Sequence, residues 1–261
     1  MDDQEKKNTL SRFSHIFRNE ELHYNRKKLR SGTIIDLEDE SFFKRVNQKF
    51  VKLLGDVKGK KVLDIGCGRG NLSFYLAQKG AHVVGIDLSK NFINFCKKEM
   101  KGLNLEIDFR IMNAQIPDFE DESFDLIVGS RIIHHLPDIE LFFLECRRIL
   151  KVKGHIVFIE PLKKNPIVNM NRKYLKPKER TSYEHPLFLS EVMIAKKVFG
   201  NIQHAEYYII SPSAILFNRI FKKPKIFRIV YKVLQLIEIP LYEIEFLRHY
   251  CWQTIFKSVK I

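Results

Sequence analysis

Three glycines at alternate positions form the part of this sequence with the clearest chemical meaning. Residues 61–65 are mainly apolar and lead into Gly66, Gly68 and Gly70. An apolar run that ends in glycines is typical of a buried strand followed by a tight turn, where backbone N–H groups approach a ligand at a helix N-terminus. Asp87 ends the next apolar run, and its carboxylate can accept hydrogen bonds from two neighbouring hydroxyls. Together these residues predict a site for a nucleoside-type ligand.

The spacing of the glycines disfavours a nicotinamide dinucleotide as that ligand. The dinucleotide fingerprint is Gly-x-Gly-x-x-Gly. Here the pattern is Gly-x-Gly-x-Gly, and Asn71 and Leu72 stand where the third glycine of the fingerprint is expected. The sequence therefore favours a different nucleoside ligand.

The same segment closely resembles motif I of class I S-adenosylmethionine-dependent methyltransferases, and Asp87 resembles the ribose-binding acid of that family. The likeness continues in the family's order through residues 124–128, through the His-His-Leu-Pro-Asp loop at 134–138 and through residues 150–160. It covers roughly residues 50–160 and is greatest to the branch that acts on small molecules, which includes quinone C-methylating enzymes.

The resemblance implies S-adenosyl-L-methionine as cofactor. The glycines would let the backbone touch its methionine and ribose portions, Asp64 would favour its ammonium group, and Asp87 would hold the ribose hydroxyls. Asn113 stands where the family commonly has an acid that accepts from the adenine amino group; its amide oxygen can still accept but carries no charge. The cofactor-binding residues implied are Asp64, Gly66, Cys67, Gly68, Gly70, Asp87, Leu88, Asn113, Ala114 and Ser130.

Two adjacent histidines are the candidate catalytic residues. A sulfonium methyl group is already activated, so a base is needed only when the acceptor is a hydroxyl, an ammonium group or an acidic carbon. His134 and His135 can supply one, because imidazole titrates near neutral pH. The alternative is that one of them only holds the turn before Pro137 through a hydrogen bond.

A loop between residues 161 and 187 supplies the candidate acceptor-binding residues. Arg180, Glu184 and His185 resemble a pattern in a bacterial subgroup of these methyltransferases and place a cation, an acid and a titratable ring in one segment. The alternative is an arginine–carboxylate pair that only fixes the loop.

Composition agrees with one elaborated α/β domain of 261 residues, of which 45% are hydrophobic. We expect residues 1–40 to form a helical cap segment and residues 41–261 to form the methyltransferase domain. The first thirty residues lack the apolar centre of a secretory signal. No charge-free apolar run reaches the ~18 residues of a membrane span. The four cysteines have neither disulfide nor metal spacing, so we expect no metal and a cytoplasmic protein.

The net charge of +14 indicates a partner with negative charge or a solvated lysine-rich surface. A basic surface favours nucleic acid, anionic lipid headgroups or phosphorylated substrates, and charge alone does not distinguish them. We expect a small-molecule or lipid-like methyl acceptor, with peripheral contact to an anionic membrane as an option and nucleic acid as a less favoured partner. The oligomeric state is not predicted.

The order of apolar and amphipathic segments predicts a Rossmann-like, doubly wound α/β fold with a seven-stranded, mostly parallel sheet and helices on both faces. Strand-like runs lie at 61–65, 82–87, 105–111, 124–129 and 155–160, and further strands are expected at 203–210 and 251–259. Helices are expected at 42–54, from Asn71, from a Ser89 N-cap, from Asp138 and at 190–199. Parallel strands of this kind bind ligands at their carboxyl ends.

Two excursions from this order, at 161–187 and 213–248, are expected to cover the site. The first excursion is predicted to be an ordered loop because it is rich in proline and polar residues. The second contains a helix at 226–239 with a wide apolar face and a polar stripe of Arg228, Lys232, Gln235 and Glu238. That face is expected either to pack on the core or on a second copy, or to serve as a lid for a hydrophobic or membrane-resident acceptor.

The expected function is methyl transfer to a hydroxyl oxygen of a small or lipid-like acceptor, with a carbon acceptor as the second choice. Two alternatives remain at this stage. The positive charge fits a tRNA or rRNA methyltransferase, and the departure at Asn113 fits a non-catalytic scaffold or membrane-associated binding protein.

Overall fold

A computed structural model describes residues 8, 11–26, 43–175, 183–221 and 224–261. Within these residues the centre of the fold is a seven-stranded sheet in the order β3-β2-β1-β4-β5-β7-β6. Strands β1 to β5 are parallel, and β7 runs antiparallel to both β5 and β6. The strands are β1 Lys61–Ile65, β2 His82–Asp87, β3 Ile107–Ile111, β4 Phe124–Ser130, β5 Leu150–Pro161, β6 Gln203–Tyr207 and β7 Gln253–Val259. The predicted fold class is confirmed.

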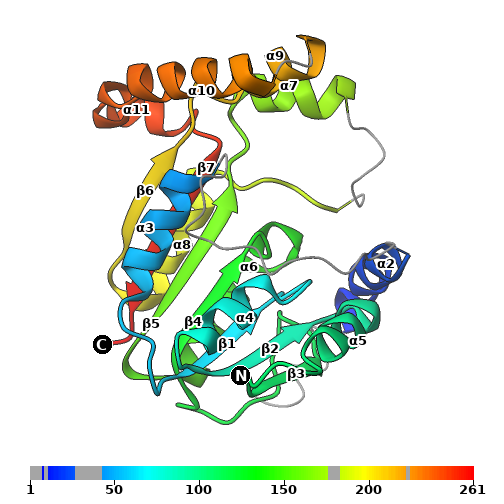
Figure 1. Cartoon of the computed structure of the whole chain (residues 1–261). Coiled ribbons are helices and arrows are strands. Elements are labelled where there is room, and N and C mark those ends of the chain that lie inside the picture. Colours follow the sequence, from blue (N-terminus) through cyan, green and yellow to red (C-terminus); the bar gives the residue numbers. More distant parts are fainter. Residues whose placement is uncertain (1–7, 9–10, 27–42, 176–182, 222–223) are drawn as a thin grey trace.

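Helices cover both faces of the sheet, as the alternation of segments predicted (Figure 1). One face packs against α3 (Lys44–Leu54), α4 (Asn71–Gln78) and α5 (Lys90–Glu99). The other packs against α6 (Ile139–Ile149) and α8 (Leu189–Phe199). Each helix directs an apolar stripe at the sheet, so two hydrophobic cores form with the sheet between them.

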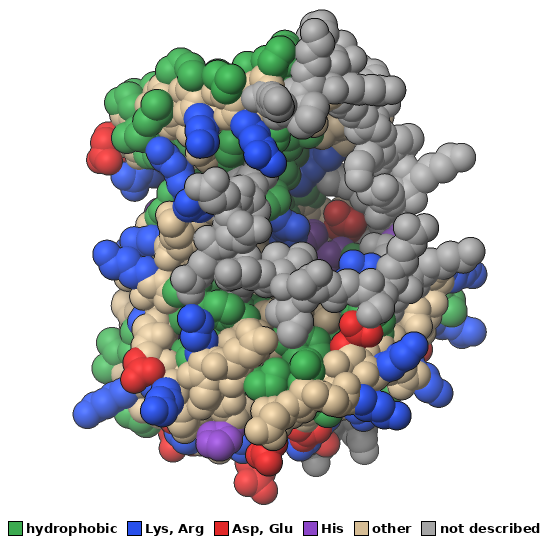
Figure 2. Space-filling view, in the orientation of Figure 1, with side chains coloured by type: hydrophobic (Ala, Val, Ile, Leu, Met, Phe, Trp, Pro, Cys, Tyr) green, Lys and Arg blue, Asp and Glu red, His purple; other side chains and the backbone are tan. Residues whose placement is uncertain are grey.

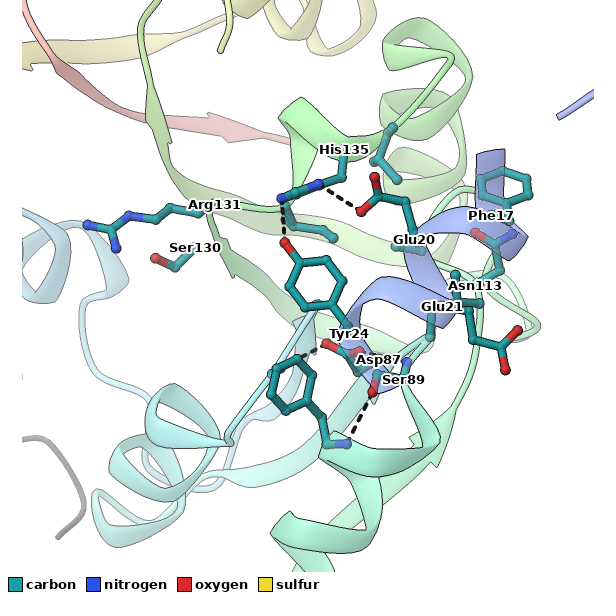
Figure 3. Close-up of a pocket in the computed structure, with 17 residues that line it drawn as sticks. Phe17, Glu20, Glu21, Tyr24, Asp87, Ser89, Asn113, Ser130, Arg131 and His135 are labelled. Atoms are coloured by element: carbon teal, nitrogen blue, oxygen red, sulfur yellow. Dashed lines mark hydrogen bonds and ion pairs between the residues drawn. The ribbon is translucent and has the colours of Figure 1, made fainter. Parts of the chain in front are cut away.

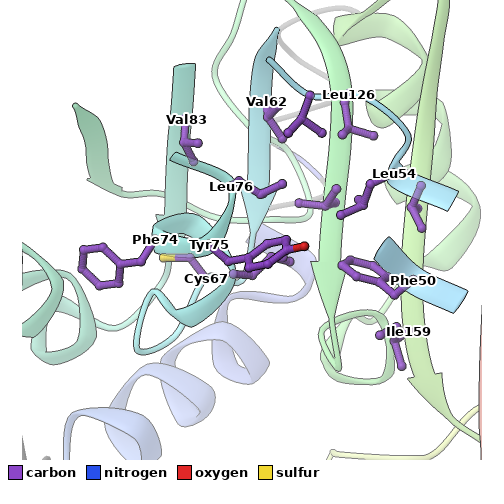
Figure 4. Packing of buried hydrophobic residues seen from close by; sticks show 14 of the residues in the cluster. Phe50, Leu54, Val62, Cys67, Phe74, Tyr75, Leu76, Val83, Leu126 and Ile159 are labelled. Carbon is purple, nitrogen blue, oxygen red and sulfur yellow. The ribbon is translucent and has the colours of Figure 1, made fainter. Parts of the chain in front are cut away.

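The core beneath α3 and α4 shows how this packing holds the site strands in place. Phe50 of α3 and Tyr75 of α4 lie over the central strands, in the same hydrophobic cluster as Val62 and Leu126 (Figure 4). Phe50, Val62 and Leu126 are at most 1% exposed. Because such cores are close-packed, the carboxyl ends of β1 and β4 are fixed relative to each other.

Local capping residues set where the helices of the site begin. The Ser89 hydroxyl accepts from the Phe92 N–H at the start of α5. Asp138 accepts from the Leu141 N–H at the start of α6 in the same way. Gly80 follows α4 with a φ of 86°, the left-handed backbone that favours glycine after a helix. The predicted helix starts at Ser89 and Asp138 are therefore confirmed.

A further layer of helices lies beyond the carboxyl end of β5 (Figure 1). It consists of α7 (Pro166–Leu175), α9 (Ser213–Phe221), α10 (Pro224–Glu238) and α11 (Glu245–Arg248), with a 3₁₀ turn at Pro240–Glu243 before α11. The expectation of a loop throughout 161–187 is wrong in its middle, where α7 forms. Proline fits the first position of a helix, and the Asn165 side chain caps α7 by accepting from the Val168 N–H.

The polar stripe predicted on α10 does not face solvent along its whole length. Glu238 is fully buried, and its carboxylate accepts from the backbone N–H groups of residues 209, 210 and 211. It also accepts from the hydroxyls of Ser211 and Tyr242. Glu238 therefore faces the protein, and much of the apolar surface of α10 is left outside.

The N-terminal helix α2 (Ser14–Asn25) packs against α5. The expected boundary between a cap segment at 1–40 and the rest of the chain falls in residues 27–42, outside the described part. No helix among the described residues combines the length and apolar character needed to cross a membrane.

The strand order reverses between β1 and β4, since β2 and β3 lie on one side of β1 while β4 and β5 lie on the other. At such a switch point the helices that follow neighbouring strands cover opposite faces of the sheet, which leaves a crevice at the carboxyl ends. Gly66, Asp87 and Ser130 lie at this edge.

Candidate active site

A cavity of about 250 Å³ lies at the carboxyl ends of β1, β2 and β4. This is just below the roughly 300–1,000 Å³ of typical ligand pockets, because side chains of α2 fill one side. Of the residues predicted from the sequence, those that line the cavity are Gly66, Gly68, Asp87, Leu88, Asn113, Ala114, Ser130 and His135.

Asp87 ties the glycine loop to the end of β2. Its Oδ2 accepts from the Gly68 N–H at 2.9 Å, and its Oδ1 accepts from the Ser89 N–H at 2.8 Å. Burial raises the pKa of Asp87, while these two N–H groups and His135 oppose the rise. Each carboxylate oxygen has a second acceptor site, so Asp87 can still receive two hydroxyls of a ribose.

The glycine loop leaves room for a ligand at one position and fits closely to the protein at another. A Cβ added at Gly68 would meet no atom within 4 Å, so its backbone borders the open cavity. A Cβ added at Gly66 would lie 2.7 Å from the Ile132 side chain. Both residues have positive φ, 52° at Gly68 and 68° at Gly66, a conformation that glycine adopts without strain.

Asn113 and Ala114 line the cavity after β3, where the resemblance implied the adenine ring. The Asn113 Oδ1 already accepts from the Gln115 N–H at 2.9 Å. This hydrogen bond fixes the orientation of the amide and leaves one acceptor position on the oxygen. Asn113 can therefore accept from an amino group as an acid would, but without charge.

Three residues implied as cofactor ligands, Asp64, Cys67 and Gly70, are not among the cavity-lining residues. Asp64 is 1% exposed and accepts from the Ser73 hydroxyl at 2.6 Å. Burial raises its pKa to about 7, opposed by this hydrogen bond. Cys67 is buried, and Gly70 begins α4 with a φ of 77°. Asp64, Cys67 and Gly70 therefore support the glycine loop and do not border the cavity.

The structure separates the two candidate histidines. The Nδ1 of His134 lies 2.7 Å from Oε2 of Glu160, and the other Glu160 oxygen accepts from the N–H groups of Ile132 and Ile133. His134 is 5% exposed and is not a cavity-lining residue, whereas His135 is. Burial lowers the pKa of His134, opposed by Glu160. His134 thus pairs with the carboxylate that binds the backbone of this turn, and His135, unlike His134, lines the cavity.

His135 lies between two side chains of α2 (Figure 3). Its Nδ1 lies 3.0 Å from Oε2 of Glu20, and its Nε2 lies 3.3 Å from the Tyr24 hydroxyl. Burial raises the pKa of Tyr24, and the carboxylates of Glu184, Glu20 and Asp87 raise it further. Tyr24 therefore keeps its proton and can donate it to Nε2 when the ring proton of His135 is on Nδ1, the nitrogen that faces Glu20.

The end of α2 is fixed to the first turn of α5. The Oδ1 of Asn25 accepts from the Ser89 hydroxyl at 2.8 Å and from the Asn91 N–H at 3.1 Å. Ser89 also bonds to Asp87 through its own N–H. One chain of contacts thus connects the Asp87 carboxylate to the helix that carries Glu20 and Tyr24.

Of the three predicted acceptor-binding residues, the structure describes Glu184 and His185. Arg180 lies outside the described residues. Glu184 is not among the cavity-lining residues; its Oε1 is 3.9 Å from the His134 Nε2, and its charge raises the pKa of Tyr24. His185 turns toward the start of α8, with its Nε2 3.6 Å from Oε1 of Glu191.

Sequence reasoning missed Glu20 and Tyr24. Ile16, Glu20 and Tyr24 are spaced by four residues and share one face of α2. Ile16 and Glu20 are 7% and 6% exposed. A carboxylate on an otherwise apolar helical face was the available signal, since an acid is almost never buried without a partner.

Comparison with known proteins identifies the domain to which these residues belong. A family model described as "Methyltransferase domain" matches residues 63–158. That range runs from the glycine loop through β5 and includes Asp87, Asn113 and His135. The fold is that of the class I S-adenosylmethionine-dependent methyltransferases, and residues 63–158 of the chain carry a methyltransferase domain.

Two curated relatives are similar to the same part of the chain. Phosphoethanolamine N-methyltransferase 1 of Arabidopsis thaliana is 37% identical over 111 residues, which are 42% of this chain and 23% of the relative. Ubiquinone biosynthesis O-methyltransferase of Coxiella burnetii is 33% identical over 113 residues, 43% of this chain and 48% of the relative. The chain thus aligns with less than half the length of either protein.

Solved structures show the same fold over most of the chain. The geranyl diphosphate C-methyltransferase of Streptomyces coelicolor A3(2), solved with S-adenosyl-L-homocysteine, aligns with a TM-score of 0.61 at 15% identity, covering 94% of this chain and 98% of that one. The predicted resemblance and its cofactor, S-adenosyl-L-methionine, are confirmed at the level of the family.

Proposed function

We propose that this chain transfers a methyl group from S-adenosylmethionine to a hydroxyl oxygen of a small or lipid-like molecule. The observation that carries the proposal is the position of His135, held between Glu20 and Tyr24 at the wall of the cavity that also contains Asp87. A hydroxyl acceptor has a proton to lose, and this arrangement provides a base for it.

The residues at the cavity fit S-adenosylmethionine. Asp87 has free acceptor positions for a ribose diol, Gly68 presents backbone to open space, and Asn113 keeps one acceptor for an adenine amino group. When bound, the cofactor supplies a methyl group that its positive sulfur has already activated. The protein is then required mainly to position the acceptor and to remove its proton.

His135 is suited to that proton transfer. With its ring proton on Nδ1 facing Glu20, the Nε2 lone pair points to the position that the Tyr24 hydroxyl occupies in this structure. An acceptor hydroxyl at that position would give its proton to Nε2 as its oxygen takes the methyl group. The resulting imidazolium would be stabilised by the Glu20 carboxylate, in the way that a buried carboxylate orients and stabilises a catalytic histidine.

Amine and carbon acceptors remain alternatives to the hydroxyl. The relative from Coxiella burnetii is named as an O-methyltransferase, and the relative from Arabidopsis thaliana as an N-methyltransferase. An ammonium acceptor also loses a proton, so the same base would serve. The two names support a small-molecule acceptor, and identification of the methylated atom decides between them.

The experiment measures methyl transfer from labelled S-adenosylmethionine to a panel of phenols, aminoalcohols and quinol lipids, with total RNA as a further acceptor. With an accepted hydroxyl compound, we expect His135→Gln to lower kcat about 10²–10⁴-fold, the usual contribution of a general base. Glu20→Gln should also lower kcat, and the dissociation constant of S-adenosylhomocysteine should stay unchanged.

Glu21→Gln is the matched control, because Glu21 lies on the same helix and lines the same cavity but does not pair with His135. Its kcat should equal that of the parent protein. Full activity of His135→Gln on a hydroxyl acceptor would refute the assigned base. Methylation of RNA alone would replace the small-molecule proposal, and cofactor binding without turnover on any acceptor would favour a scaffold.

A further inference from the structure

An apolar face of α10 is exposed along most of the helix. Ile229 and Leu236 are each 64% exposed, and Ile237 is 53% exposed. Ile226 and Val233, at 41% and 48%, complete the stripe at helical spacing. Of the sixteen large hydrophobic residues exposed in the described part of the chain, eight lie between Ile226 and Phe246. Isolated apolar residues are normal on a surface, but a contiguous face of this kind marks an interaction site.

The opposite face of α10 is firmly attached to the protein. Tyr231 is 8% exposed and belongs to the hydrophobic core, and Glu238 is fully buried against the backbone of residues 209–211. A helix held by a buried carboxylate with five hydrogen bonds cannot rotate to hide Ile229 and Leu236. The structure therefore presents the apolar stripe outward.

Positive charge borders the stripe. Arg228 and Lys232 are exposed and lie one turn apart on the same flank of α10. Glu238, the acid of α10, is turned inward, and the nearest exposed acids, Glu243 and Glu245, lie beyond the end of the helix. In Figure 2 hydrophobic side chains follow the upper edge of the molecule over α10, with Lys and Arg side chains directly below them.

We propose that α10 docks the protein on the surface of an anionic lipid bilayer. An apolar stripe with basic residues at its edge is the pattern of a helix that lies in the membrane interface. A helix of 15 residues is about 22 Å long, too short to span a bilayer. A second copy is a poorer occupant, because two chains of net charge +14 would bring equal basic flanks together.

The proposal does not depend on the methyl transfer reaction. The stripe belongs to the helical layer beyond the carboxyl end of β5 and shares no residue with the cofactor cavity (Figure 1). Loss of membrane binding and loss of cofactor binding can therefore be measured separately on the same protein.

The test is co-flotation of the full chain with vesicles. We expect binding to vesicles of phosphatidylcholine mixed with phosphatidylglycerol, weakened by salt, and little binding to phosphatidylcholine alone. Ile229→Asn combined with Leu236→Asn should lower the partition coefficient about tenfold or more, because two large side chains no longer enter the interface. Arg228→Gln combined with Lys232→Gln should lower it about tenfold on the anionic vesicles.

Leu144→Asn combined with Val152→Asn is the matched control, since these side chains are 49% and 56% exposed on other elements. It should leave vesicle binding unchanged. All variants are checked for unaltered binding of S-adenosylhomocysteine and unaltered thermal melting. These checks distinguish a specific loss of vesicle binding from unfolding of the protein. The proposal is overturned if the parent protein does not float with anionic vesicles, or if the α10 variants float as it does. A dimer that the Ile229/Leu236 variant alone converts to monomer, without vesicle binding by either, would assign the face to a second copy.

Discussion

Replacing Asp87 by asparagine removes one acceptor and adds a donor at the centre of the proposed cofactor site. In the parent protein both carboxylate oxygens accept from backbone N–H groups, Gly68 at 2.9 Å and Ser89 at 2.8 Å. The amide that Asp87→Asn introduces can accept with its oxygen only. The amide oxygen can keep one of the two backbone N–H groups, Gly68 or Ser89. The NH₂ group then faces the other N–H, which loses its acceptor.

The two effects have separate magnitudes. A buried N–H left without a partner destabilises the fold by about 1–3 kcal/mol. Because the Gly68 and Ser89 hydrogen bonds are part-buried, Asp87→Asn should show a loss of about 1 kcal/mol, the low end of this range, in urea unfolding without ligand. Hydrogen bonds to a charged acceptor contribute about 1.5–3 kcal/mol each. Loss of one of the two expected ribose bonds, with weakening of the other, should lower affinity by about 2–3 kcal/mol, which is about 30- to 150-fold.

Calorimetric titration of S-adenosylhomocysteine measures this loss directly. Asp108→Asn is the control, because Asp108 is an exposed acid of the adjacent strand β3 and pairs with Arg110 away from the cavity. It should bind as the parent protein does. Asp87→Asn that folds and binds within about threefold of the parent, a difference below about 1 kcal/mol, would show that this carboxylate does not hold the ribose.

Two further perturbations test the glycine loop and Asp64 of the preceding strand. Gly66→Ala places a Cβ 2.7 Å from the Ile132 side chain, whereas Gly102→Ala adds one that meets nothing within 4 Å at a similarly positive φ. Urea unfolding should show Gly66→Ala to be less stable than Gly102→Ala by about 1–3 kcal/mol, the usual effect of overpacking, and equal losses would mean that Ile132 moves aside freely. Burial raises the pKa of Asp64 from 3.8 to about 7, so the folded state binds its proton more tightly than the unfolded state does. The free energy of unfolding should therefore fall between about pH 4 and pH 7 by on the order of 4 kcal/mol relative to Asp64→Asn and stay level above about pH 7. Parallel pH curves for the two proteins would show that Asp64 titrates normally.

Features that depend on neighbours in the chain could be predicted from the sequence. The strand-to-glycine turn at 61–70 is local, because three glycines supply a backbone that other residues adopt only with strain. Asp87 follows its strand directly, so the topology of parallel strands places it beside Gly68. Ser89 and Asp138 start helices through their own side chains. The class of fold follows from the order of these segments.

Features that depend on which segments meet could not be predicted in this way. The sequence offered His134 and His135 as equals. The structure distinguishes them because Glu160, 26 residues from His134, binds His134, while Glu20 and Tyr24 of α2 contact His135. The wide apolar surface at 226–239 was evident, but its orientation depends on where the buried Glu238 finds its donors.

The sequence by itself determined the class of cofactor and the pairing of the glycine loop with Asp87. Both are set by backbone conformation and residue order. Only the tertiary structure brought together the residues that we propose to act on the acceptor. Tyr24 lies 111 residues from His135 in the chain, and the two meet because α2 packs against α5 and lines the cavity. A contact of that range is specified by the packing of whole elements, and no spacing within a single segment encodes it.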